Sequence, residues 1–217
     1  MRAQSEAAMP ELKRPYPRIQ YGETGSCGGN QGWFADGNFR RCGCGVVACA
    51  DTLLYLRGRT GLPREEYIHY VNSLRKYFPL IPYRGIDGVR LAAGMNMCLR
   101  RASIPLRALW SASGRRFWDR LAAMLADDLP AILSIGPNFP RVWGAEELML
   151  YRGAEDGGYV GAGRVKAHFL TATGLDGERI RVSSWGQELY IERAAYERYM
   201  RVSSTALLTN LLQLRRL

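Results

Sequence analysis

The sequence predicts an α+β fold in which helices come first and an antiparallel sheet follows. Between residues 43 and 126, apolar side chains recur every three or four positions, the spacing of helices that bury one face. After Pro130 the pattern changes to short apolar or alternating segments, which is typical of strands. Asp176-Gly177 then marks a tight turn between two of these segments, as in a β-hairpin. The chain has 217 residues and no internal repeat, so a single domain over residues 1–217 is expected.

Four helices are expected in the first part of the chain. The first begins at Cys44, and Gly58 lies just beyond its last apolar residue, as at many helix ends. The second begins at Pro63, because proline and the acids Glu65 and Glu66 favour a first helical turn. The expected helices are residues 44–57, 63–74, 89–102 and 117–126.

The expected sheet occupies residues 130–192. Its first strand, residues 131–135, is apolar except for Ser134 and ends at Gly136-Pro137. Five glycines within residues 153–163 predict a loop or hairpin tip, and not a phosphate-binding loop, because no Gly-Lys-Ser/Thr follows them. Further strands are expected at residues 165–173, 179–184 and 188–191, a closing helix at residues 206–214, and an irregular lead-in at residues 1–29.

Composition and charge limit the classes of function. The chain is 47% hydrophobic and 23% charged, as globular proteins are, and no stretch approaches the ~20 apolar residues of a membrane span. Residues 1–18 are polar and lack the apolar core of a signal peptide, so a cytoplasmic location is expected. The net charge of +10 suggests an anionic substrate or an acidic partner protein. Nucleic acid is not the expected partner, because the arginines form scattered pairs and no nucleic-acid-binding motif is present.

The five cysteines do not indicate a disulfide framework or a zinc site. An odd number in a chain of this length is unlike a small disulfide-stabilised domain. No second closely spaced pair accompanies Cys42 and Cys44. Cys49 and Cys98 lie in apolar helical segments, where cysteine packs as a small hydrophobic side chain. We therefore expect no metal site, and nothing in the sequence indicates a cofactor.

Gly43-Cys44-Gly45 at the start of the first expected helix is the clearest indication of chemistry. The free amides and the dipole of a helix N-terminus favour the thiolate, which is the reactive form of cysteine. Only two histidines could supply a base, and His69 lies in a helical segment where packing or solvent exposure is expected. His168 lies in an expected strand, so Cys44 and His168 are predicted as nucleophile and base. The flanking Gly43 and Gly45 are expected to let a substrate approach the backbone closely.

The expected hairpin also predicts which residue faces His168. If Asp176-Gly177 is a two-residue turn, His168 pairs with Trp185. Side chains two apart share one face of a strand, so Ser183 and Trp185 project to the side of His168, and Ser184 to the other side. Ser183 is therefore expected within hydrogen-bonding reach of His168. A change of one residue in the turn would overturn this assignment.

These motifs resemble those of the papain-like cysteine peptidases. The similar features are Gly-Cys-Gly-Val-Val-Ala opening a helix, His168 on a strand, and the segment Ser183-Ser184-Trp185-Gly186. The similarity is greatest to the bacterial branch related to peptidases that remove double-glycine leaders from bacteriocins. The resemblance spans residues 30–190 and implies a papain-like fold, in which helices carrying the nucleophile pack on an antiparallel sheet carrying the histidine. It implies Cys44 as nucleophile, His168 as base, Ser183 as orienting third residue and Trp185 as an aromatic shield.

The chain departs from this family at the third catalytic residue and at the oxyanion donor. Ser183 stands where asparagine or aspartate is usual, so it can orient an imidazole but carries no charge to stabilise imidazolium. The family's donor is a glutamine about six residues before the nucleophile. Asn38 has that spacing, whereas Gln31 is the matching residue type but lies thirteen residues before Cys44, so both are candidates. Cys42 is also followed by glycine, but the helical pattern begins only after Cys44.

The sequence therefore predicts a cysteine hydrolase, a peptidase or amidase acting on a peptide. One alternative is an acyltransferase with the same nucleophile, for which the basic surface would suit an acidic carrier protein. The other is an inactive papain-like domain that binds peptide in the old cleft, as the serine at position 183 would allow. Double-glycine leader peptidases are normally fused to a transporter, and nothing in this sequence predicts a membrane span or ATP binding, so that specific role is not inferred.

Overall fold

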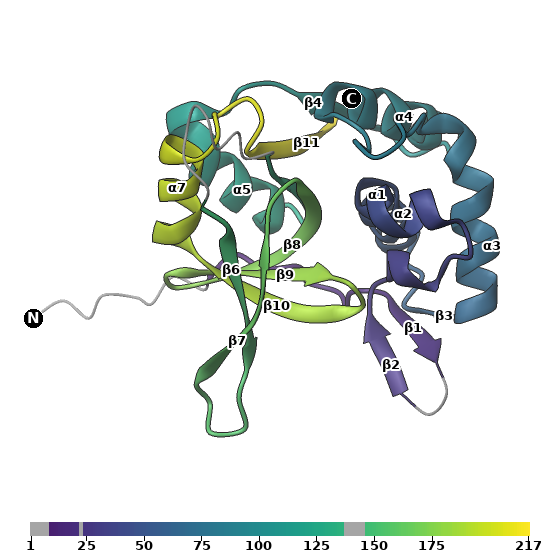
Figure 1. Cartoon of the computed structure of the whole chain (residues 1–217). Helices are drawn as coiled ribbons and strands as arrows, with labels where there is room; N and C mark the ends of the chain where they lie inside the picture. The colour runs from purple at the N-terminus through teal and green to yellow at the C-terminus, as the bar shows by residue number, and fades with distance from the viewer. Residues whose placement is uncertain (1–8, 22–23, 137–145) are drawn as a thin grey trace, which may run out of the picture.

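The computed structural model describes residues 9–21, 24–136 and 146–217, and over these residues the chain is α+β, as predicted. A helical half and a sheet half lie side by side (Figure 1). Helix α2 (Cys44–Leu56) packs against α3 (Arg64–Leu74) and α4 (Gly88–Arg101) in the helical half and against the large sheet in the other half. The predicted nucleophile and the predicted base therefore come from different halves of the molecule.

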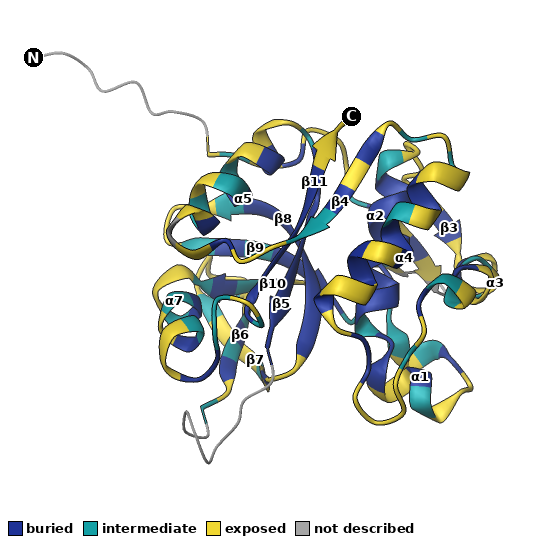
Figure 2. Ribbon diagram, turned by 90° about the horizontal axis from the view of Figure 1, so that it is seen from above, coloured by how far each residue is buried: buried dark blue, intermediate teal, exposed yellow. Residues whose placement is uncertain are grey.

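The helices expected from the apolar spacing are present with nearly the expected bounds. They are α2, α3 (Arg64–Leu74), α4 (Gly88–Arg101) and α5 (Phe117–Ala126). A short helix that was not expected, α1 (Gly37–Cys42), precedes α2, and the Asp36 carboxylate caps it. Residues 45–55 of α2 are all buried, whereas α4 buries only one face, and Figure 2 shows this difference between the two helices. A helix that is apolar all round belongs in the interior, which places the start of α2 inside the molecule.

Residues 1–29 were predicted to be irregular, and for the described residues 9–21 and 24–29 this prediction is wrong. Strands β1 (Arg18–Tyr21) and β2 (Thr24–Cys27) form an antiparallel hairpin there, and β3 (Gly61–Pro63) pairs with β1 in parallel. Each strand has only three or four residues, and among residues 18–20 of β1 only the Ile19 side chain is buried. Strands this short show no readable alternation, so the sequence pattern missed them.

The large sheet is antiparallel, as predicted, and has eight strands among the described residues, in the order β4-β11-β5-β8-β9-β10-β6-β7. Residues 168–174 of β8 are all buried, so both faces of this central strand are covered. Helices α2 and α5 both pack against it. The eight strands are β4 (Leu106–Trp110), β5 (Ala131–Ile135), β6 (Leu148–Gly153), β7 (Tyr159–Val165), β8 (His168–Asp176), β9 (Arg179–Ser184), β10 (Gln187–Glu192) and β11 (Asn210–Arg216).

The closing helix predicted at residues 206–214 is wrong. Residues 210–216 form β11, which lies between β4 and β5, and the last helix is instead α7 (Arg193–Val202). Residues 210–214 are buried without alternation. The leucines at 207, 208, 211, 212 and 214 have the three- and four-residue spacing of a helix, and the polar Asn210 and Gln213 are buried as well, so spacing alone predicted the wrong element. The glycines at 153–163 do mark a hairpin tip, between β6 and β7.

Candidate active site

Cys44 is the first residue of α2, where the sequence predicted it. Gly43 precedes the helix and forms no side-chain cap, so the first amides of α2 have no side-chain acceptor. A Cβ added to Gly43 would lie 2.6 Å from the Phe39 carbonyl oxygen, and one added to Gly45 would lie 3.1 Å from side-chain atoms of Phe169 and of two residues of the helical half. The spaces beside both glycines are thus filled by protein atoms. The structure gives them a packing role, and their part in substrate approach stays a prediction.

The Cys44 thiol lies against the first residues of β8. Burial raises the pKa of this thiol, while the backbone amides of Phe169 and Gly45 favour the thiolate and partly oppose the rise. The residue as a whole is only partly buried, whereas Cys42, Cys49 and Cys98 are buried. Among the five cysteines, Cys44 combines a helix N-terminus with access from solvent.

His168 is the first residue of β8 and is buried. Its Nε2 lies 2.7 Å from Ser184 Oγ, and the Trp185 ring lies 4.6 Å from the imidazole, tilted by 32°. Burial lowers the pKa of His168 to about 4, because no charged group offsets the cost of desolvating imidazolium. The imidazole is therefore neutral at neutral pH and can accept a proton. With Nε2 occupied by Ser184, Nδ1 is the nitrogen left for a thiol.

Ser184, and not Ser183, contacts the histidine, so the predicted hairpin register is wrong by one residue. The turn residues are Gly177-Glu178, and a bulge at Thr173 then shifts the pairing back by one, which places Thr171 opposite Ser183. Ser183 Oγ instead donates to the Cys27 carbonyl oxygen, 2.9 Å away.

The bulge lies where β8 exchanges one neighbour for another. Residues 168–172 of β8 pair with β5, and beyond the bulge the chain near Glu11 takes that place. The Leu12 amide donates to the Thr173 carbonyl oxygen at the bulge itself. The contact comes from a segment more than 160 residues away in the sequence, so the residues of the hairpin carry no local sign of it.

Trp185 is held over His168 by an unusual turn. Ser184 pairs with Gln187, so Trp185-Gly186 is a two-residue hairpin loop. Both residues have positive φ, 52° and 74°, as a type I′ turn requires. This conformation is rare for an aromatic residue and is more common near functional sites. Asn30 Nδ2 donates to the Trp185 carbonyl oxygen at 3.0 Å and fixes the turn from outside.

The two candidate oxyanion donors lie in different places. Gln31 lines the same narrow cavity as Cys44, His168 and Ser184, and its Nε2 donates to the Arg40 carbonyl oxygen at 2.8 Å. Asn38 lines a separate groove, and its Oδ1 accepts from the Tyr83 amide at 3.1 Å. Of the two amides, only that of Gln31 is brought to the cavity of the thiol.

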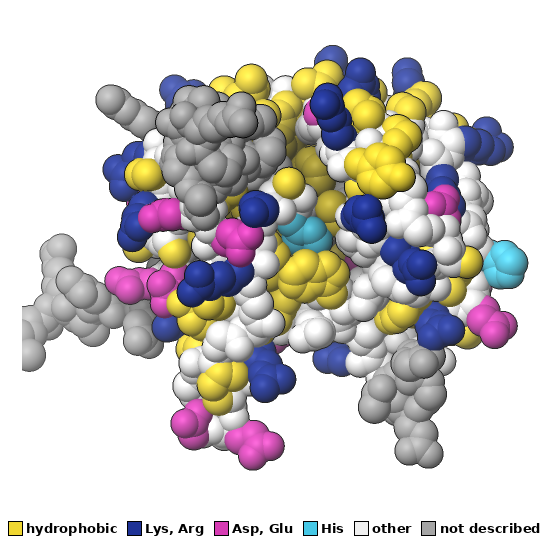
Figure 3. Space-filling model, viewed as in Figure 1, with side chains coloured by type: hydrophobic (Ala, Val, Ile, Leu, Met, Phe, Trp, Pro, Cys, Tyr) yellow, Lys and Arg dark blue, Asp and Glu magenta, His cyan; other side chains and the backbone are white. Residues whose placement is uncertain are grey.

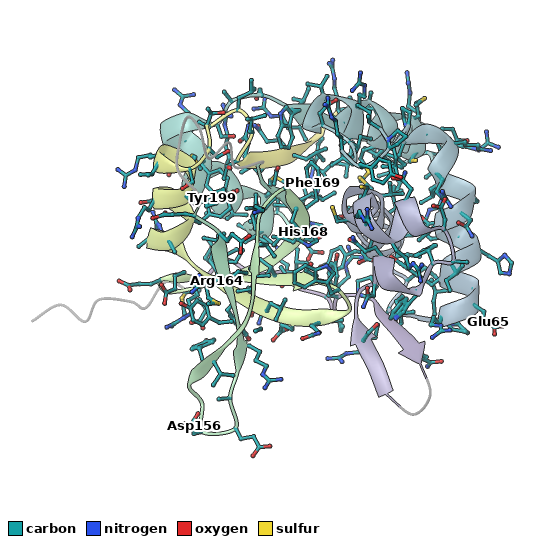
Figure 4. All side chains as sticks on the ribbon, in the orientation of Figure 1. Glu65, Asp156, Arg164, His168, Phe169 and Tyr199 are labelled. Carbon is teal, nitrogen blue, oxygen red and sulfur yellow. The ribbon has the colours of Figure 1, made fainter. Side chains whose placement is uncertain are left out.

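An apolar cleft of about 420 Å³ runs from Cys44 and His168 along the boundary between the two halves. Figure 3 shows this hollow with hydrophobic walls and a histidine at its floor, and Figure 4 labels His168 and Phe169 at the same place. His69, the other histidine, is exposed on α3, far from the cleft. The side chains that make the cleft apolar include Ile81, Ile86, Val89, Trp110, Phe169 and Leu207.

Asp51 is a buried residue of this region that the sequence pattern did not single out. It lies seven positions after Cys44 on α2, is 3% exposed, and lines the narrow cavity with Ser183 and Gly29. Burial raises its pKa to about 7. A signal was present in the sequence, because Asp51 is the one charged residue between Cys44 and Leu56.

Comparisons of the chain with protein-family models, with curated proteins and with solved structures found no match. The described residues contain no helix long and apolar enough to cross a membrane, and no group of three or more His, Cys, Asp or Glu side chains that could hold a metal ion. The geometry of the site and the sequence resemblance are therefore the basis for a function.

Proposed function

We propose that this protein is a papain-like cysteine hydrolase that cleaves a peptide amide. The observation that carries the proposal is the meeting of three groups from different elements in one cavity. They are the thiol of Cys44 at the start of α2, the neutral imidazole of His168 on β8, and the hydroxyl of Ser184 on Nε2 of that imidazole. A nucleophile, a base and a residue that orients the base are the parts that acyl transfer through cysteine requires.

In this mechanism thiol and imidazole begin neutral, as the raised pKa of Cys44 and the lowered pKa of His168 favour. The Cys44 sulfur attacks the carbonyl carbon while its proton passes to Nδ1 of His168, and the carbonyl becomes an oxyanion. The Gln31 amide and the α2 N-terminus are the donors available to it. Breaking the C–N bond releases the amine, which takes the proton from His168. Water then attacks the thioester, again with His168 as base, and restores the thiol.

The apolar cleft supports a peptide with a large aliphatic or aromatic side chain near the scissile bond. Its volume of about 420 Å³ is within the range of sites that bury small organic ligands. Its charged and polar lining side chains are those of Arg84, Asp87, Ser134 and His168, and the rest of the lining is apolar side chains and glycine.

A leucine-containing peptide vinyl sulfone tests the proposal. The Cys44 sulfur should add to the vinyl carbon while His168 delivers a proton to the neighbouring carbon, giving one thioether adduct at Cys44. Cys44→Ala should abolish the adduct, and Cys42→Ala should leave it. An intact protein that forms no adduct would favour an inactive peptide-binding domain.

A second candidate function is acyl transfer, favoured by a basic groove beside the cleft. This groove, of about 660 Å³, is lined by Gly37, Asn38, Arg40, Arg41, Pro82 and Tyr83. Neither arginine forms an ion pair with any described residue, and Arg41 lies over the ring of Tyr83, at 5.8 Å. Unpaired arginines at this place would suit an acidic carrier protein that delivers an acyl group. Mass spectrometry with an acyl thioester separates the two functions: an adduct on Cys44 discharged faster by an amine than by water supports transfer.

A further inference from the structure

Asp51 accepts two hydrogen bonds beneath the candidate active site. The Tyr67 hydroxyl donates to Oδ1 at 2.7 Å, and the Gly29 amide donates to Oδ2 at 2.9 Å. The carboxylate lies seven residues after Cys44, which is about two turns along the same face of the helix. One side chain of α2 thus reaches a loop that approaches from the small sheet.

That loop, residues 27–31, passes between Asp51 and strand β9. A Cβ on Gly28 would lie 2.5 Å from Asp51 Oδ2 and 2.6 Å from Ser183 Oγ, and a Cβ on Gly29 would lie 2.0 Å from the Tyr67 hydroxyl oxygen. Gly28 also has φ of 69°, a conformation that glycine adopts without strain. The two glycines are therefore the residues that allow the backbone to come this close to the carboxylate.

The loop leads directly to the active-site cavity. Gln31 follows Gly29 by two residues, begins a short 3-10 helix and lines the cavity of Cys44. Asn30, between them, caps that helix and donates to the Trp185 carbonyl oxygen. The positions of the Gln31 amide and of the Trp185 turn thus depend on a backbone segment that Asp51 holds from the other side.

A buried carboxylate with two neutral donors is costly for the fold. Its desolvation is offset only by the hydrogen bonds from Tyr67 and Gly29, and burial raises its pKa to about 7. A well-packed apolar side chain at this position on α2 would often be as stable or more so. An apolar side chain could not accept the hydrogen bond from the Gly29 amide. Because Gly28 and Gly29 have no side chains, this part of the loop is anchored through its backbone.

We propose that Asp51 is a positioning residue, which holds the Gly28-Gly29 segment so that the Gln31 amide faces the thiol of Cys44. This inference rests on the proposed function, because it assigns Gln31 to the oxyanion that forms in that reaction. Asp51 itself does not touch the substrate.

The test measures binding of a peptide aldehyde, acetyl-leucyl-leucinal, which adds reversibly to the thiol and places an oxygen where the oxyanion forms. Binding is read as protection of Cys44 from iodoacetamide. Asp51→Asn keeps the size of the side chain but turns an NH2 group toward one of the two donors. We expect aldehyde affinity to fall about tenfold, as for Gln31→Ala, with the alkylation rate of free Cys44 unchanged. The double variant should lose no more than either single one, because both act on one group.

Thr52→Val is the matched control. Thr52 is also fully buried on α2, and its hydroxyl has no hydrogen-bond partner among the described residues. This variant should bind the aldehyde as the wild type does. If Asp51→Asn does not fold, Tyr67→Phe removes one of the two bonds and should weaken binding about threefold.

Two results would overturn the positioning role alone. One is wild-type affinity in Asp51→Asn and Tyr67→Phe, and the other is a loss in the double variant equal to the product of the single losses. A wild-type protein that reacts with neither the aldehyde nor the vinyl sulfone would instead remove the proposed function, and the role of Asp51 with it.

Discussion

His168 and Asp51 line the same narrow cavity, yet burial moves their pKa values in opposite directions. The pKa of His168 falls to about 4, and that of Asp51 rises to about 7. The cause is the same in both cases, because each side chain is bonded to uncharged partners and desolvation penalises its charged form. Burial in this cavity thus disfavours a charge on either side chain, and for Asp51 the hydrogen bonds from Tyr67 and Gly29 partly oppose this effect.

The same comparison predicts opposite effects of pH on stability. Between pH 4 and 6.5 the folded state keeps His168 neutral while the unfolded chain binds a proton, so this residue makes stability rise with pH. Between pH 3.8 and 7 the folded state keeps Asp51 protonated while the unfolded chain releases the proton, so that residue makes stability fall with pH. Between pH 4 and 6.5, where the two ranges overlap, the two contributions to the pH dependence of stability cancel in the wild type. A variant that removes one residue leaves the contribution of the other to be measured.

The largest expected effect is the loss of reactivity when the base is removed. His168→Ala should slow modification of Cys44 by the peptide vinyl sulfone by about 100-fold or more, because His168 is the one imidazole among the described residues that line the cavity. His69→Ala, at the exposed histidine, should leave the rate unchanged. The rate constant for adduct formation is measured by mass spectrometry, and equal rates in the two variants would reject His168 as the base.

Removing the carboxylate should change how stability depends on pH. Relative to the wild type, the free energy of unfolding of Asp51→Asn should increase by roughly 4 kcal/mol between pH 4 and pH 8, because the variant lacks the falling contribution. Urea unfolding at several pH values gives this difference, and Thr52→Val should show none. A constant offset between Asp51→Asn and wild type would mean that Asp51 is ionised in the folded protein throughout.

Removing the imidazole should produce the opposite slope. His168→Gln lacks the contribution that rises with pH, so relative to the wild type it should gain roughly 3 kcal/mol of unfolding free energy as pH falls from 7 to 4. Urea unfolding tests this as well. A gain of similar size in His69→Ala would show that the effect does not come from burial of His168.

The smallest effect separates the two serines. Ser184→Ala removes one neutral hydrogen bond to His168 and should slow vinyl sulfone modification about fivefold to tenfold. Ser183→Ala loses the bond to the Cys27 carbonyl oxygen and should leave the pH dependence of the reaction unchanged. The rate of vinyl sulfone modification is measured for both variants from pH 4 to pH 8. A larger effect in Ser183→Ala than in Ser184→Ala would support the register predicted from the sequence.

Local patterns in the sequence were enough to find α2 and to place Cys44 at its start, because helical spacing repeats within each turn. They were not enough for Ser184, since the bulge at Thr173 lies where the distant segment near Leu12 pairs with β8. The buried run at residues 210–214 likewise took its strand form from neighbours far away in sequence. Gln31 was left undecided because loop length, and not residue type, brings it to the cavity.

Strand β11 has a consequence for how the protein is made. It pairs with β5, and β5 in turn pairs with the His168 end of β8. About 40 residues separate the end of β8 from the end of β11, which is a few seconds of synthesis at typical rates. During that interval β5 presents an unpaired edge to other nascent chains. The core around the histidine is therefore completed only after β11 has been synthesised, and not when β8 has formed its hairpin with β9.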